Sequence, residues 1–181
     1  QVTSALFGYG SFELSSVKNS ANALFYFALG LPAFAFIKVF SSYIFARQNT
    51  KIPFVFSLYS VVANIFISIY FFSDFGFIII PIATSISSWL NAMLLFLYLI
   101  KKNYFSFDGL INFTIFKILI ISIITTLIFN QLINYFDYLL AYESEYKLLT
   151  IISIVFVTFI IYLLISIFTK AFKISDIKLK Y

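Results

Sequence analysis

Five long runs without a charged residue constrain the fold of this chain more than any other feature. They cover residues 19–37, 52–73, 75–100, 118–136 and 148–169. At ~1.5 Å per helical residue, each run is long enough to cross ~30 Å of hydrocarbon. The strands of a membrane barrel would alternate in polarity and be about half as long. The sequence therefore predicts an all-α integral membrane protein with five transmembrane helices.

Composition agrees with this class, because 62% of the residues are hydrophobic and only 10% are charged. Such a chain has too little polar surface to cover a soluble domain. With their flanking residues, the expected spans are about 21–46, 53–73, 76–100, 112–136 and 147–169. An external segment, 1–20, precedes them and a cytoplasmic tail, 170–181, follows.

Lysine and arginine are divided unevenly between the two sides of the predicted spans. The richer side collects Arg47, Lys51, Lys101, Lys102, Lys117, Lys170, Lys173, Lys178 and Lys180. The other side has only Lys18 and Lys147. Because cytoplasmic loops carry the excess of these residues, we expect an external N-terminus and a cytoplasmic C-terminus. An external start without methionine suggests that further helices precede this chain.

Several function classes are disfavoured by what the chain lacks. It has no histidine or cysteine, and all its carboxylates lie in predicted loops or tails. No catalytic dyad, metal-ligand cluster or glycine-rich phosphate loop is present. Basic residues are scattered singly rather than gathered in a stripe, which disfavours nucleic acid as a partner. We expect no enzyme activity, no metal and no cofactor.

Small and polar side chains recur at helical spacing in three of the predicted spans. They are Ser57, Ser60, Asn64 and Ser68, then Ala83, Ser87 and Asn91, then Ser122, Thr126, Asn130 and Asn134. Residues three or four apart share one helix face, and in lipid such faces turn toward other helices. We expect Asn64, Ser87, Asn91 and Asn130 to serve helix packing. A polar substrate path is the alternative.

The first span contains two features of its own. Pro32, two residues after Gly30, predicts a kink because proline removes a backbone hydrogen bond within a helix. Gly30 and Pro32 are therefore hinge candidates, although static kinks are common in membrane helices. Beyond them lies Lys38, whose ammonium costs roughly 3 kcal/mol at the bilayer centre unless it reaches water or a partner.

Three cations are candidates for facing a substrate path or an anion. Lys38 either borders a polar cavity, snorkels toward the interface or pairs with an acid of another segment. Arg47 and Lys51 either anchor the helix end at anionic headgroups or contact a substrate phosphate.

Two stretches resemble the C-terminal half of the MurJ (MviN) family, proposed flippases of the peptidoglycan precursor lipid II. The first, ALGLPAFAFIKVFSSYIFARQNTKIPF, has the family's Gly-Leu-Pro helix, its Lys-Val pair and its Arg-Gln-x-x-Lys-x-Pro turn. The second, GFIIIPIATSISSWLNAMLLF, ends in the family's Asn-Ala-x-Leu-Leu pattern. The resemblance covers Ala5 to about Lys102; the last two spans match only in hydrophobicity and position.

The resemblance implies the C-terminal portion of a fourteen-helix exporter-superfamily fold, helices ten to fourteen, that works by alternating access in the bacterial inner membrane. The implied partners are lipid II or a similar polyprenyl-linked anionic glycolipid, membrane lipids and the upstream helices of the same protein. The last two helices would help to form a groove for the lipid tail. Two other functions stay open: a non-transporting membrane scaffold, and a related polysaccharide or drug exporter.

Overall fold

A computed structural model describes residue 3 and residues 14–104, 109–141, 144 and 146–171. All the regular structure in these residues is helical. The chain divides into two compact units, one of residues 18–106 and one of residues 1–17 and 107–181. The predicted all-α fold is confirmed.

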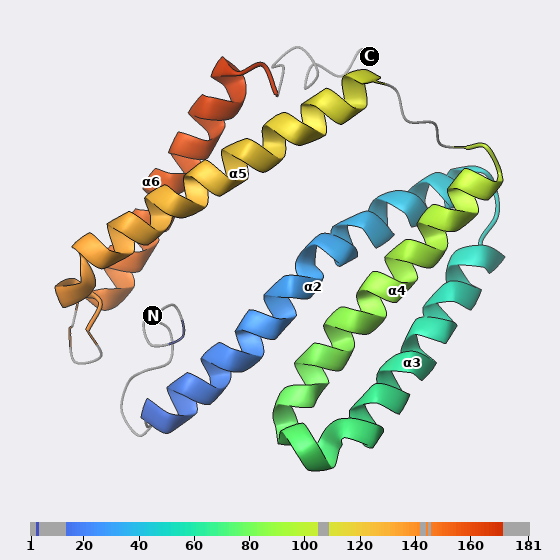
Figure 1. Cartoon of the computed structure of the whole chain (residues 1–181), viewed down its shortest axis with the longest axis horizontal. Coiled ribbons are helices and arrows are strands. Elements are labelled where there is room, and N and C mark those ends of the chain that lie inside the picture. Colours follow the sequence, from blue (N-terminus) through green and yellow to red (C-terminus); the bar gives the residue numbers. More distant parts are fainter. Residues whose placement is uncertain (1–2, 4–13, 105–108, 142–143, 145, 172–181) are drawn as a thin grey trace. The chain divides into compact units, whose positions relative to one another are not determined.

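The unit of residues 18–106 contains three long helices. They are α2 (Leu14–Ala46), which begins just before the unit, α3 (Lys51–Phe75) and α4 (Ile79–Lys101). A short 3₁₀ turn, Gly76–Ile78, joins α3 to α4, and the two helices run back along each other as a hairpin (Figure 1). Gly76 has a φ of 58°, a left-handed conformation that glycine adopts without steric cost.

Four helical stretches among the described residues are long and apolar enough to cross a membrane: Ser15–Ala46, Lys51–Lys101, Phe113–Tyr135 and Lys147–Phe168. The second stretch contains both arms of the α3–α4 hairpin, so the five predicted helices are all present. Their bounds differ slightly from prediction. The first helix begins at Leu14 instead of near residue 21, because LSSVKNS contains no helix-breaking residue.

The helices α2, α4 and α6 end in the same backbone conformation. Gln48, Asn103 and Lys170 have φ values of 59°, 53° and 54°, and the next residue's amide bonds back to the carbonyl of Ile44, Leu99 or Ser166. This left-handed cap satisfies carbonyls that have no partner within the helix. In α2 the cap lies inside the turn ARQNTK, so this turn ends the helix sharply and lets α3 begin at Lys51.

Apolar and aromatic side chains hold the unit of residues 18–106 together at one end. Ile44 of α2 is buried with Leu95 and Leu99 of α4, and partly buried side chains of all three helices surround them. Phe40 and Phe96 stack with ring centroids 5.7 Å apart, which joins α2 to α4. Pro53 and Pro81 each lie in the first turn of their helix, where a missing N–H leaves no bond unmade.

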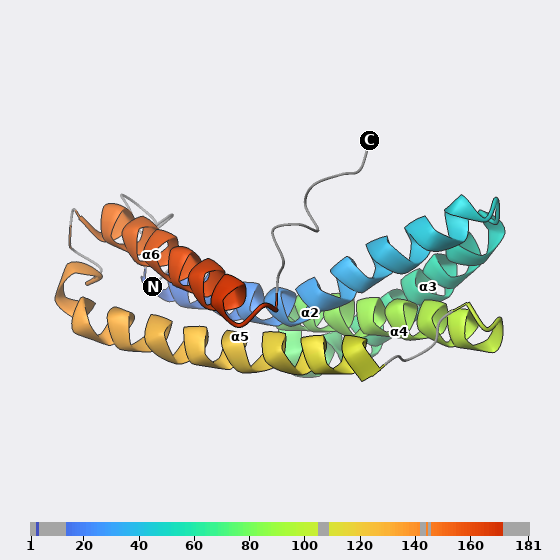
Figure 2. The same ribbon diagram turned by 90° about the horizontal axis from the view of Figure 1, so that it is seen from above.

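The other unit is built on the helices α5 (Gly109–Tyr135) and α6 (Lys147–Phe168). These two helices lie side by side (Figures 1 and 2). Leu140, Ile151 and Ile154 form its buried cluster. At the far end of the pair, Lys117 Nζ of α5 donates to the carbonyl of Thr169, 3.0 Å away, at the C-terminus of α6. A cation at this position is favoured by the partial negative charge of a helix C-terminus.

Candidate functional site

A seam of polar side chains joins α3 to α4. Asn64 Nδ2 donates to Thr84 Oγ1 and to Ser87 Oγ, each 3.2 Å away. One turn earlier on α3, the hydroxyl of Ser60 donates to the backbone carbonyl of Ser87. The two hydroxyls that accept from Asn64 also donate to carbonyls of α4 itself. The polar faces predicted on these helices therefore meet each other.

The two other asparagines predicted to serve packing lie in different surroundings. Asn91 is buried in the unit of residues 18–106, and its Oδ1 has no hydrogen-bond partner within the described residues. Asn130 is exposed on α5. Its predicted role in helix packing is therefore untested, and would require a helix other than α6 as the partner.

We expect Asn64→Leu to lower the stability of the chain by about 1 kcal/mol, because two interhelical hydrogen bonds of roughly 0.6 kcal/mol each are lost. Reversible unfolding in mixed micelles, followed by circular dichroism, measures the difference. The same substitution at the exposed Asn130 is the matched control and should change stability by less than ~0.5 kcal/mol. Equal effects of the two substitutions would show that the seam contributes nothing specific.

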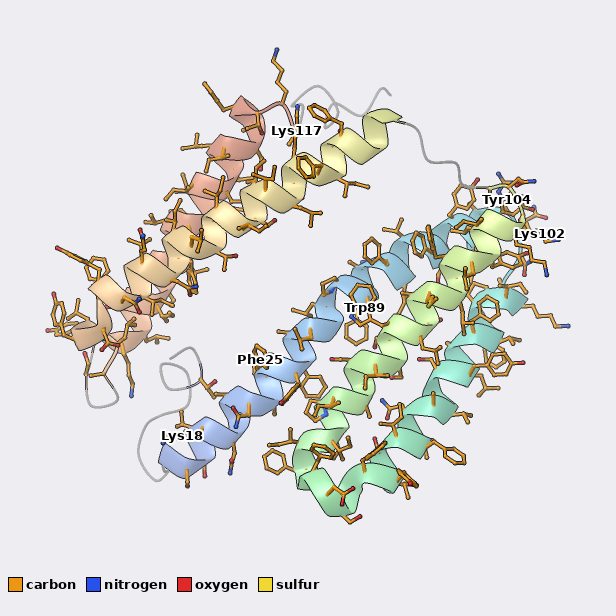
Figure 3. The ribbon with its side chains drawn as sticks, viewed as in Figure 1. Lys18, Phe25, Trp89, Lys102, Tyr104 and Lys117 are labelled. Atoms are coloured by element: carbon orange, nitrogen blue, oxygen red, sulfur yellow. The ribbon has the colours of Figure 1, made fainter. Side chains whose placement is uncertain are left out.

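The helices α2 and α4 approach each other closely at Gly30, one of the hinge candidates. A Cβ atom added to Gly30 would lie 2.9 Å from Ser85 Oγ and 3.2 Å from Ser85 Cα. Real Cβ atoms essentially never show the first distance and rarely show the second, so any side chain at this position would require α2 and α4 to shift apart. Ser85 donates a hydrogen bond to the carbonyl of Tyr26, and Trp89 Nε1 donates to the carbonyl of Leu29 at 3.0 Å. Figure 3 shows Trp89 between the two helices.

The other hinge candidate, Pro32, lies inside α2, which remains one helix. Figure 2 shows that α2 changes direction partway along its length. The candidate cations Lys38 and Lys51 are both exposed, Lys38 on α2 beyond Pro32 and Lys51 at the start of α3. Within the described part of the chain, Lys38 forms no hydrogen bond or ion pair.

Arg47 lies just after α2, in contact with the side chains of Tyr43 and Tyr104. Its guanidinium donates to the hydroxyl of Tyr43 at 2.7 Å and lies 3.9 Å from the centre of the Tyr104 ring. The hydrogen bond to Tyr43, with the nearby tyrosine hydroxyls, raises the pKa of Arg47 above its ordinary value. The group therefore keeps its charge at every working pH. Lys102 and Tyr104 lie at this same end of the unit, and Lys18 lies near the other end of α2 (Figure 3).

A groove with a volume of about 280 Å³ lies between α5 and α6. Its lining consists of hydroxyl-bearing and aromatic side chains: Ser122, Thr125, Thr126, Phe129, Thr158 and Tyr162. The threonine hydroxyls donate to carbonyls of their own helices, each 2.8 Å away. They are thereby turned toward the backbone, so the groove offers mainly methyl groups and rings to a ligand.

Sequence reasoning missed three residues that the structure brings to important contacts: Ser85, Trp89 and Tyr104. Two of them bond to backbone carbonyls, which leave no side-chain pattern on the partner helix. A tryptophan within an apolar span, such as Trp89, fits an interfacial or a packing role equally well. The spacing of Ser85 and Trp89, one helical turn apart, was the one available signal that they share a face.

Comparison with known proteins gives a family match over most of the chain. The model of the family described as "Lipid II flippase MurJ" matches residues 1–151. This region extends beyond the motifs noted in the sequence, through α5 and into the first turn of α6.

Individual relatives give the same result. The chain is 31% identical over 151 residues to the "Probable lipid II flippase MurJ" of Rickettsia prowazekii (strain Madrid E), which covers 83% of this chain and 29% of that protein. It is 34% identical over 103 residues to the protein of the same name from Rhizobium meliloti (strain 1021), covering 57% and 19% of the two chains. The chain thus spans less than a third of the length of these relatives.

Proposed function

Because the chain belongs to the lipid II flippase MurJ family, we propose that it forms the C-terminal part of a transporter that moves a polyprenyl-linked anionic glycolipid, such as lipid II, across the bacterial inner membrane. Translocation would proceed by alternating access, with upstream helices of the same protein completing the transport path. The single observation that carries this proposal is the family match over residues 1–151.

Two features of the chain suit such a substrate. The groove between α5 and α6 is lined mainly by methyl groups and rings, together with the hydroxyls of Ser122 and Tyr162, and a largely apolar lining suits a polyprenyl tail. The cations Lys38, Arg47 and Lys51 are exposed on the helices α2 and α3 or beside them, where a phosphate-bearing headgroup can reach them. We assign the groove to the tail and these cations to anionic groups.

We also infer an orientation in the membrane from the distribution of the basic residues. Arg47, Lys51, Lys101 and Lys102 lie at the ends of α2, α3 and α4 that meet at the ARQNTK turn. Lys117 and the C-terminus of α6 lie together at one end of the α5–α6 pair. Assigning both ends to the cytoplasm agrees with the excess of basic residues on cytoplasmic loops. The segment before α2 is then external.

The decisive experiment is genetic. The complete gene that encodes this chain is expressed in cells depleted of their own lipid II flippase, and growth and the flipping of labelled lipid II are measured. We expect both to be restored. The relative from Rickettsia prowazekii, expressed in the same cells, is the positive control.

Protein that reaches the membrane at normal levels but restores neither growth nor flipping would refute the proposed substrate. A non-transporting scaffold, which the α3–α4 polar seam would suit, predicts that result. An exporter of another polysaccharide or of drugs predicts it too, and measured export of those compounds would separate the two.

A further inference from the structure

We propose that Trp89 of α4 is a clamp that fixes the bend of α2 at Pro32. Ser85, one turn earlier on α4, supports it by holding the first half of α2. A clamp is here a side chain that contacts the helix on both sides of the bend and so sets the angle between its two halves. The inference rests on contacts within the unit of residues 18–106 and does not depend on the transported substrate.

Trp89 touches both halves of α2. Its indole Nε1 donates to the carbonyl of Leu29, three residues before Pro32, at 3.0 Å. Its ring packs against Phe36, four residues after Pro32, with the ring centroids 6.1 Å apart. A change in the bend moves Leu29 and Phe36 relative to each other, so it must break at least one of these contacts.

Ser85 and Gly30 hold the first half of α2 against α4. The hydroxyl of Ser85 donates to the carbonyl of Tyr26, one turn before Gly30. Because Gly30 has no side chain, the backbone of α2 can come close enough for both hydrogen bonds to form. A backbone carbonyl has two lone pairs, so these bonds add to those within the helix.

The bend needs such support because proline alone leaves it soft. Pro32 cannot donate to the carbonyl of Ala28, and its ring pushes that carbonyl away, so the helix loses a bond that would keep it straight. Neighbouring helices help a membrane helix to tolerate proline; here α4 donates to the carbonyls of Tyr26 and Leu29, which lie on either side of the freed carbonyl of Ala28. Trp89 and Ser85 are the donors that α4 supplies around Pro32.

The clamp controls where the second half of α2 lies. That half carries Lys38, Ile44 and, at its end, Arg47. Ser85 holds the first half against α4 through Tyr26, and the contacts of Phe40 and Ile44 with α4 hold the second half. Loss of the Leu29–Trp89 bond would therefore loosen the angle at Pro32 without detaching either half. Trp89 is therefore a positioning residue for the exposed cations of α2.

Pulsed electron paramagnetic resonance on the full chain in lipid nanodiscs tests this directly. The chain has no cysteine, so spin labels attach only at the substitutions Asn22→Cys and Ser42→Cys, exposed positions on opposite sides of Pro32. Along a straight helix these residues would be about 30 Å apart, and bending shortens the distance.

We expect one narrow distance distribution in the wild-type background. Trp89→Phe removes the N–H donor and keeps an aromatic ring, and it should raise the ratio of straightened to bent conformers roughly fivefold, the change expected for one hydrogen bond. Tyr59→Phe, which removes a polar group from an exposed ring on α3, should leave the distribution unchanged.

A second variant keeps the proposal testable if Trp89→Phe loses helical content. Phe36→Leu retains apolar bulk but removes the ring contact on the other side of the bend, and it too should broaden the distribution. An unchanged distribution in a folded Trp89→Phe chain would overturn the clamp, because Pro32 and the remaining contacts of α2 with α4 would then set the bend. If Trp89→Phe does not fold but Phe36→Leu does, an unchanged distance distribution in Phe36→Leu would also overturn the clamp.

Discussion

Replacement of Gly30 by leucine is expected to destabilise the chain by about 3 kcal/mol, at the upper end of the cost of overpacking a well-packed contact. The first atom of the new side chain would already lie 3.2 Å from the Cα atom of Ser85, which belongs to the backbone of α4 and cannot rotate away. The two helices must therefore separate. Separation also removes the hydrogen bonds from Ser85 and Trp89 to α2.

Gly30→Ala tests the same close approach, because the sign of its effect on stability depends on the surroundings of the residue. At an open helical position, glycine to alanine stabilises by about 1 kcal/mol through helix propensity. At Gly30 we expect the opposite sign, since even one Cβ atom is too close to Ser85. Ala28→Leu, on the exposed surface of the same helix, is the control for leucine and should change stability by less than ~0.5 kcal/mol. Stabilisation by Gly30→Ala, measured by reversible unfolding in mixed micelles, would contradict the close approach.

The number of helices could be predicted from the sequence because long apolar runs allow few other structures in a membrane. The polar seam was also within reach, since Ser60, Asn64 and Ser87 lie at helical spacing on their own helices. Which faces meet was not encoded in either helix alone. The structure pairs Asn64 with Thr84 and Ser87 because the short turn at Gly76 makes α3 and α4 antiparallel neighbours.

The contacts of α2 were harder to predict, and Gly30 shows why. In the sequence, Gly30 beside Pro32 suggested a hinge, because both residues weaken a helix. The structure adds a steric reason for glycine that depends on α4, more than fifty residues further along the chain. Backbone carbonyls that accept from Ser85 and Trp89 occur at every residue, so no pattern in α2 marks Tyr26 or Leu29 as their acceptors.

On the proposed function, the second large effect is expected for Lys38→Met in the complete protein. Lipid II flipping should slow tenfold or more, which corresponds to an activation barrier about 1.4 kcal/mol higher. Lys38 is exposed on the second half of α2 and has no hydrogen bond or ion pair within the described part of the chain. A lysine in hydrocarbon costs several kcal/mol, so one within an apolar span has to reach water, a partner or the interface. On the proposed function, Lys38 reaches an anionic group of the substrate. Methionine keeps the length of the side chain and removes only the charge.

The controls decide between transport and anchoring. Val39→Met changes the neighbouring exposed side chain without altering charge and should leave flipping unchanged, whereas Lys38→Arg should retain most of it because the positive charge remains. Normal flipping by Lys38→Met at normal membrane levels would mean that the lysine only snorkels to the interface. The clamp gives an independent expectation: because Lys38 moves with the half of α2 that Trp89 positions, Trp89→Phe should reduce flipping in the wild-type protein but cause little further loss once Lys38 is methionine.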